Sequence, residues 1–167
     1  MSMKNRWIAL YVENEVGVLA KVSGLFAGKS YNLHSLTVGT TEDETISRMT
    51  IGVTSDDTTF EQIKKQLNRM VEVIKVMDLT DTPTHMKEIL YVKVMGLNAE
   101  GRAELFQIAQ VFAVDVVDIG VDSVLLECKL KERKNNELIA LLKTRFKRIN
   151  VVRGGAVAIE AISTRSR

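Results

Sequence analysis

The sequence predicts an α+β protein made of two tandem β-α-β-β-α-β sandwiches, each a sheet with helices packed on one face. Three observations lead to this prediction. Hydrophobic residues make up 46% of the 167 residues and charged residues 26%, which excludes a disordered chain. The only proline, Pro83, lies in a short polar stretch near the middle of the chain. The same order of strand-like and helix-like segments occurs on both sides of it.

The first half contains the complete pattern. Apolar and aromatic residues predict strands at residues 7–12, 31–38, 45–53 and 71–79. From residue 16 to Phe26 the apolar residues follow a helical spacing. A second helix is expected to begin at Asp56-Asp57-Thr58, where Thr58 and Glu61 have the spacing of a capping box. This order is that of a ferredoxin-like unit.

The second half repeats the order with different residues. Strands are predicted at residues 89–95, 114–119, 124–130 and 149–162. Asn98 is placed to cap a helix that continues to Phe112, and the apolar residues from Leu138 to Phe146 mark another. The sequence therefore predicts one ferredoxin-like domain at residues 4–80, a linker at 81–87 and a second ferredoxin-like domain at 88–163. Because each sheet has one uncovered face and free edges, we expect the chain to form an oligomer.

Charge and cysteine content exclude several classes of protein. The chain has 23 basic and 21 acidic residues, and this even balance does not indicate binding to nucleic acid or to an anionic membrane. A single cysteine, Cys128, permits no internal disulfide. No apolar run reaches the roughly 18 residues needed to cross a bilayer, and the N-terminus does not have the pattern of a signal peptide. We therefore expect a cytoplasmic protein.

No group of residues indicates catalysis or metal binding. His34 and His85 have no further ligands at suitable spacing, and Cys128 lies in an apolar strand, where a buried packing role is more common than nucleophilic chemistry. The sequence contains neither a nucleophile elbow nor a pair of catalytic carboxylates. We expect no catalytic residue, no metal site and no cofactor in this chain.

The segment between the first strand and the first helix is a candidate binding site. Its residues are Glu13-Asn14-Glu15-Val16-Gly17-Val18-Leu19. Free N–H groups at a helix start favour a carboxylate, and Gly17 permits close approach to the backbone. Asn14 offers both a donor and an acceptor, while Val16, Val18 and Leu19 offer an apolar wall, so an amino acid would fit. Asn32 could add a second amide. The alternative is an ordinary turn glycine and turn asparagine.

The same residues carry a family resemblance. The loop, followed by Val22-Ser23-Gly24-Leu25-Phe26, resembles the start of an ACT domain. The segments 31–38, 47–51 and 62–67 narrow the resemblance to the small regulatory subunits of acetolactate synthase. It extends more weakly through 112–118 and Arg153-Gly154-Gly155, and so covers nearly the whole chain.

The resemblance implies a function in branched-chain amino-acid biosynthesis, including that of isoleucine. Such subunits have no active site; they activate a catalytic large subunit that uses thiamine diphosphate, Mg²⁺ and FAD. They usually confer feedback inhibition by valine, held between the ACT domains of a homodimer. Carried onto this sequence, the implied effector site comprises Asn14, Gly17, Val18 and Leu19 of one protomer with Asn32 and Leu33 of the other.

Two departures from the family pattern bear on this expectation. His34 stands where relatives usually carry glutamate, and Gly154 stands where serine or threonine is usual. The sequence leaves open whether valine, leucine or isoleucine is preferred, whether inhibition is retained, and what the stoichiometry of the complex is. The alternative function is that of a stand-alone ACT sensor of amino acids acting on another enzyme or on a transcription factor.

Overall fold

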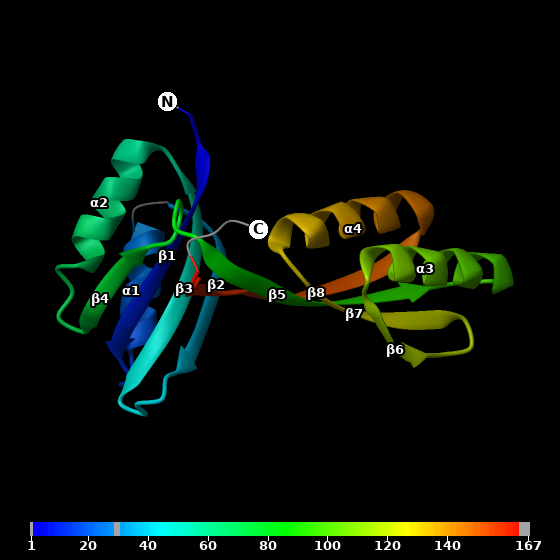
Figure 1. The fold of residues 1–167 in the computed structure, drawn as a ribbon, viewed down its shortest axis with the longest axis horizontal. Helices are drawn as coiled ribbons and strands as arrows, with labels where there is room; N and C mark the ends of the chain where they lie inside the picture. The colour runs from blue at the N-terminus through cyan, green and yellow to red at the C-terminus, as the bar shows by residue number, and fades with distance from the viewer. Residues whose placement is uncertain (1, 29–30, 164–167) are drawn as a thin grey trace. The chain divides into compact units, whose positions relative to one another are not determined.

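A computed structural model describes residues 2–28 and 31–163 (Figure 1). The described residues form eight strands and four helices in the order β-α-β-β-α-β, twice. Their bounds are β1 Lys4–Glu13, α1 Val18–Gly28, β2 Asn32–Thr40, β3 Ile46–Ser55, α2 Asp57–Leu67, β4 Val73–Asp78, β5 Thr84–Met95, α3 Ala99–Phe112, β6 Asp115–Ile119, β7 Ser123–Leu130, α4 Glu132–Arg145 and β8 Arg148–Glu160. The predicted fold class is confirmed.

The first unit is a four-stranded sheet in the order β2-β3-β1-β4, with α1 and α2 on one face (Figure 1). Alternate residues of β1 and β3 point toward the helices and form the core, among them Ile8, Leu10 and Ile51, which are fully buried. They pack against the apolar sides of the helices, including Val22 and Ile63. The intervening residues of the strands face the other way. The unit therefore has a helix face and an outer face.

The start of α2 differs in detail from the expectation. Asp56 caps the helix, and its side chain accepts a hydrogen bond from the Thr59 N–H at 2.7 Å. The helix is therefore capped by Asp56, and not by the predicted capping box between Thr58 and Glu61. Glu61 instead pairs with Lys64 at 2.7 Å, one helical turn further along. Asp56 has an extended backbone immediately before the helix, and its carboxylate binds one of the free N–H groups of the first turn.

The second unit repeats the architecture with its own core. Its sheet order is β6-β7-β5-β8, and α3 and α4 lie on one face. The predicted cap is confirmed, because Asn98 accepts a hydrogen bond from the Gly101 N–H at 2.8 Å. At the other end of α3 the chain turns at Ala113, which has a φ of 53°. The core of this unit includes Leu90, Leu126 and Leu138.

The division of the chain differs from the predicted domain bounds. Of the described residues, 2–28, 31–85 and 156–163 form the first unit, and residues 86–155 form the second. β5 already begins at Thr84, so the predicted linker at 81–87 is only partly a loop. Residues 156–160, expected in the second domain, bind the outer face of the first sheet instead. The second unit is thus an insertion in the chain of the first. No helix among the described residues is long and apolar enough to cross a membrane.

Candidate functional site

Asn14 connects the end of β1 to the turn between β2 and β3. Its Nδ2 donates to the Glu44 carbonyl at 2.8 Å, and its Oδ1 accepts from the Ser47 hydroxyl at 3.0 Å. The Asn14 backbone N–H also donates to the Thr45 carbonyl at 2.8 Å. The amide is therefore held in a fixed orientation and already makes two side-chain hydrogen bonds. A ligand at this position would use the remaining lone pair and N–H or exchange one of these bonds.

Gly17 and the first turn of α1 form the rest of the loop. Gly17 has a φ of 89°, and a methyl group added there would meet no atom within 4 Å. The Val18 N–H makes a long hydrogen bond to the Glu15 carbonyl, at 3.4 Å. The N–H groups of the next two residues have no acceptor within the helix, because the first N–H group that bonds along the helix is that of Lys21, which donates to the Gly17 carbonyl at 3.0 Å. The loop thus presents backbone donors to an open space.

The apolar residues of the loop divide between the surface and the core. The side chains of Val16 and Leu19 are exposed, by 106% and 43% of their surface. Val18 is only 4% exposed and belongs to the core, because it is the first residue on the inner face of α1. Of the predicted wall, Val16 and Leu19 are therefore available to a ligand and Val18 is not.

Charged side chains hold the first turns of α1 in place. Lys21 forms an ion pair with Glu72, the residue before β4, and this hydrogen bond raises the pKa of Lys21 and lowers that of Glu72. The Glu72 carbonyl accepts from the Glu13 N–H at 2.9 Å. Together these contacts fix the loop against β4. Glu13, Glu15 and Glu44 line a hollow beside Asn14, where they could pair with the ammonium group of an amino acid, and the start of the helix would favour its carboxylate.

The two predicted effector-site residues on β2 lie at the end of the sheet opposite the β1–α1 loop. Asn32 is exposed and pairs with Thr54, whereas Leu33 packs against the core. The end of β1 pairs with Ile46 of the same strand β3. Eight residues of β3 separate these two pairings, which corresponds to about 26 Å. The structure therefore does not bring Asn14 and Asn32 together within one chain.

A segment that the sequence pattern did not reveal covers the outer face of the first sheet. We call residues 156–160, the end of β8, the strap. The Ala156 N–H donates to Ser35 Oγ at 2.9 Å, and its carbonyl accepts from Thr37 Oγ1 at 2.7 Å. The Ala158 N–H donates to Thr50 Oγ1 at 3.4 Å. Side chains of the sheet thus take the place of a neighbouring strand. The alternation of small and large residues in this segment was the available signal.

Arg48 completes this attachment. Its Nη2 donates to the Ala158 carbonyl at 2.9 Å and to Glu160 Oε2 at 3.2 Å, and its Nη1 donates to the Tyr11 hydroxyl at 2.6 Å. Burial alone would raise the pKa of Glu160, but hydrogen bonds from its own backbone and from Arg48 outweigh it and lower the pKa. The end of the strap is therefore held by a charged pair.

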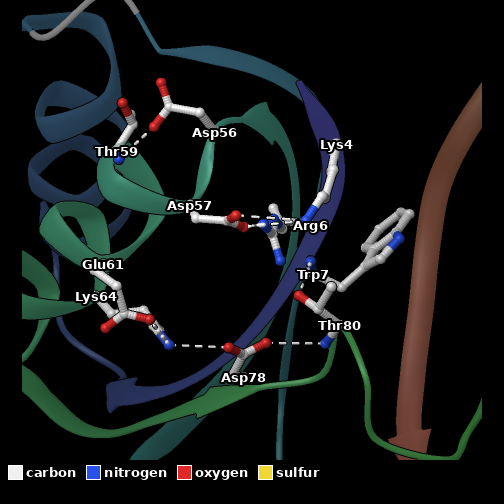
Figure 2. A network of polar contacts seen from close by, with 10 residues as sticks. All are labelled: Lys4, Arg6, Trp7, Asp56, Asp57, Thr59, Glu61, Lys64, Asp78 and Thr80. Carbon is white, nitrogen blue, oxygen red and sulfur yellow. Dashed lines mark hydrogen bonds and ion pairs between the residues drawn. The ribbon is translucent and has the colours of Figure 1, made fainter. Parts of the chain in front are cut away.

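A second polar network joins α2 to the start of β1 (Figure 2). Lys4 and Arg6 both pair with Asp57, and the buried Arg6 guanidinium lies 5.2 Å from the centre of the Phe60 ring. Lys64 donates to Asp78 at 2.9 Å. Every carboxylate named here has a partner within the chain, so the arrangement stabilises the helix rather than offering a binding site.

A buried ion pair organises the second unit. Glu88, whose side chain is 4% exposed, accepts from Arg153 Nε and Nη2, each at 2.8 Å. Asn135 Nδ2 also donates to the Glu88 carboxylate, at 3.0 Å. Burial alone would raise the pKa of Glu88, but the bonds from Arg153 and Asn135 lower it. The network joins β5, α4 and β8. Arg153, one of the residues that carry the family resemblance, therefore has a structural role.

The described residues do not group as metal ligands, since no three His, Cys, Asp or Glu side chains come together. Cys128 is fully buried, and desolvation raises the pKa of its thiol to about 11. A thiol in this state is a poor nucleophile at neutral pH. The loop between β1 and α1, with its open backbone donors, fixed amide and exposed aliphatic side chains, is the candidate binding site.

Comparison with known families accounts for both halves of the chain. A family model described as an AHAS small subunit-like ACT domain matches residues 8–75. A second, described as the small subunit of acetolactate synthase, matches residues 87–162. The chain belongs to the acetolactate synthase small-subunit family. The resemblance noted from the sequence is confirmed, and with it the prediction of a regulatory subunit that carries an ACT domain.

Individual relatives agree with the family match. The acetolactate synthase small subunit of Aquifex aeolicus is 42% identical over 152 residues, which covers 91% of this chain and 79% of the relative. That of Haemophilus influenzae is 34% identical and covers 92% and 94%. The crystal structure of the small subunit from Thermotoga maritima has a TM-score of 0.83 at 32% identity, covering 96% of this chain and 99% of that one.

Proposed function

We propose that this small subunit binds valine at the loop between β1 and α1, and that valine bound there inhibits a catalytic subunit that the chain otherwise activates. The catalytic large subunit would supply thiamine diphosphate, Mg²⁺ and FAD, and the complex would act in the cytoplasm. The observation that carries the proposal is the loop itself, where open backbone donors, a fixed amide and exposed aliphatic side chains lie together.

The geometry favours a site shared by two copies of the chain. β2 is an edge strand of the first sheet, and Asn32 lies at one end of it while Thr40 lies at the other. Thr40 pairs with Ser47, which in turn holds Asn14. If two copies pair their β2 edges antiparallel, the Asn32 end of one copy comes to the Asn14 end of the other. A homodimer of this kind would assemble the predicted residues that one chain keeps about 26 Å apart.

Calorimetric titration of the purified chain with valine, leucine and isoleucine tests the effector. We expect saturable binding of valine, tighter than that of the other two. Reconstitution with the acetolactate synthase large subunit tests the rest, because activity should rise on mixing and fall when valine is added. A chain that activates the large subunit but binds none of the three amino acids, alone or in the complex, would contradict the effector assignment. A chain that binds one of the amino acids but does not activate the large subunit would favour the stand-alone sensor.

A further inference from the structure

The strap covers the outer face of the first sheet in an unusual way. Ala156 and Ala158 face the sheet and are each 2% exposed, whereas Val157 and Ile159 point outward and are 63% and 59% exposed. A strand that served only to cover an apolar face would turn its large side chains inward. Here the small residues face inward, which permits a close approach of the backbone to the sheet. The attachment therefore depends on directed hydrogen bonds more than on buried apolar surface.

All four backbone polar groups of the two alanines bind side chains of the sheet. Those of Ala156 bind the hydroxyls of Ser35 and Thr37, on β2. Those of Ala158 bind Thr50 and Arg48, on β3. The position of the strap is consequently set by two strands at once, and a movement of either strand changes the length or angle of particular bonds.

Both strands also lead to the candidate effector site. On β2, Ser35 and Thr37 follow Asn32 and Leu33 by two to five residues. On β3, Arg48 is adjacent to Ser47, whose hydroxyl donates to Asn14 Oδ1 at 3.0 Å. A ligand that binds Asn14 and Asn32 would therefore contact residues connected to β2 and β3, the two strands whose side chains hold the strap.

The strap has room to respond. A cavity of about 350 Å³ opens beside it, lined by Tyr11, Val38, Thr41, Arg48, Val157 and Ile159. The cavity is open to solvent, and Val157 and Ile159, which line it, are largely exposed, so this side of the strap borders solvent rather than packed side chains. The same strand, β8, continues without a break into residues 148–155 of the second unit. A displacement at residue 156 is therefore passed on through the covalent chain.

We propose that the strap couples effector binding in the ACT domain to the second unit, through the four side-chain contacts that Ser35, Thr37, Arg48 and Thr50 make to Ala156 and Ala158. This inference rests on the proposed function, since it concerns how the response to valine is transmitted. The four residues are positioning residues. They lie outside the candidate effector site, so their loss should separate binding from response.

The test is a double variant, Thr37→Val with Thr50→Val, which keeps the shape of both side chains and removes two of the four contacts. Thr54→Val is the matched control, because Thr54 lies on the same strand β3 and its hydroxyl binds Asn5 at 3.0 Å. In the complex with the large subunit, we expect the double variant to bind valine within about 3-fold of the wild type and to activate normally. The valine concentration for half-inhibition should rise at least about 10-fold, while the control is inhibited like the wild type.

Three results would overturn the inference. The first is inhibition of the double variant within about 2-fold of the wild type. The second is a joint loss of valine binding, activation and inhibition in a folded protein, which would make the strap a purely structural cover. The third is failure of the wild type to bind valine, which also ends the proposed function and is thereby distinguished from the other two. If the double variant does not fold, Arg48→Gln removes the contact to the Ala158 carbonyl together with those to Glu160 and the Tyr11 hydroxyl, and it should give the same separation.

The isolated chain offers a second measurement. Amide hydrogen exchange at Ala156 and Ala158, with and without saturating valine, reports on the strap directly. We expect valine to change both exchange rates at least about 3-fold in the wild type. Unchanged rates at both amides, in a chain that binds valine, would overturn the inference.

Discussion

Gly17 is the residue of the loop that tolerates least change. Its φ of 89° is one that other residues adopt at a cost of about 1 kcal/mol or more, although the space around it is open. Two variants separate strain from charge. Gly17→Ala introduces the strain alone, whereas Gly17→Asp adds a carboxylate where the effector's own carboxylate would bind. We expect both to lower the unfolding free energy by about 1 kcal/mol, and only Gly17→Asp to weaken valine binding by more than about 10-fold.

Thermal unfolding and calorimetric titration of the two variants check this expectation. The alanine variant is the control for the aspartate variant, because the two share the backbone strain. Equal loss of binding in both would mean that the loop conformation, and not the space near Gly17, determines affinity. Normal valine inhibition in Gly17→Asp would remove the loop from the effector site.

The buried pair of Glu88 and Arg153 predicts a response to acid. A carboxyl group whose pKa is lower in the folded chain than its usual 4.5 favours folding above that pH, and this contribution is lost as the pH falls through the lower, folded value. We therefore expect the unfolding temperature of the wild type to fall more steeply below about pH 4.5 than that of Glu88→Gln. Unfolding temperatures measured between about pH 7 and pH 3 give the comparison.

Arg153→Leu tests the same pair at neutral pH. It leaves the Glu88 carboxylate buried with Asn135 as its remaining partner, and Arg153 itself is 37% exposed. We expect Arg153→Leu to lower the free energy of unfolding by about 2–3 kcal/mol. This is below the usual cost of breaking a fully buried pair, because solvent reaches the arginine.

For the acid response, parallel unfolding profiles of the wild type and Glu88→Gln would show that other carboxylates govern it, and that this pair adds little.

At the level of the element, the packing of side chains across β2, β3 and β1 on the outer face of the sheet depends on a glycine. A Cβ at Gly52 would lie 2.6 Å from His34 Nε2 and 2.9 Å from Trp7 Cη2. The two rings meet edge to face, with centroids 5.4 Å apart. We expect Gly52→Ala to destabilise the protein by about 1–3 kcal/mol, because two rings must move. Chemical denaturation measures the loss.

Gly39→Ala is the control for this variant. Gly39 lies on β2, and a methyl group there would meet no atom within 4 Å. Its substitution should change stability by less than about 0.5 kcal/mol. Equal effects of the two substitutions would show that the rings over Gly52 adapt freely, so that His34 would not be fixed by its packing.

The elements of this fold could be predicted from the sequence because their signals are local. Apolar spacing located the strands and helices, and Asn98 was recognisable as a cap from its own side chain. The strap could not be predicted in the same way. Its partners, such as Thr37 and Thr50, lie more than 100 residues earlier in the sequence, and the spacing of residues 156–160 does not indicate which residues they bind. A strand-like pattern shows that a segment is extended and leaves its partner open.

The candidate site was predicted in part for a similar reason. A glycine before a helix start is a local signal, and Gly17 does have a positive φ. Whether Val18 points to the ligand or to the core depends on the rotation of α1, which the sequence of the loop does not fix. Asn32 was proposed from the sequence as a second amide, but it lies at the other end of the sheet from Asn14, and only the resemblance to a known family assigned it to the other protomer.

At the scale of the whole molecule, the two units have separate cores but a shared chain. Residues 86–155 form the second unit, and the chain returns afterwards to the first sheet as the strap. Each sheet also ends in two edge strands, β2 and β4 in the first unit and β6 and β8 in the second. Edge strands with unpaired backbone groups are the usual sites of pairing with another chain. Association through the β2 edge would explain why the predicted effector residues are divided between the two ends of one sheet.

A site shared by two protomers makes a prediction that a site within one chain does not. Gly17→Asp disables the loop of its own chain, and Asn32→Ala disables the β2 end of its own chain. In a dimer containing one chain of each kind, one site combines both defects, while the other combines the intact loop of the Asn32→Ala chain with the intact Asn32 of the Gly17→Asp chain. Mixing two variants that do not bind valine should therefore restore binding.

The amount restored follows from random assortment. If the two variants are unfolded together and refolded in equal amounts, half of the dimers are mixed, and each has one intact site of two. About one quarter of the wild-type binding capacity should return, with wild-type affinity, because the restored site has every wild-type residue. Each variant refolded alone is the control and should bind nothing. If the mixture also binds nothing although native mass spectrometry shows mixed dimers, the loop and Asn32 must act within the same chain, and the pairing of β2 edges would have to be abandoned.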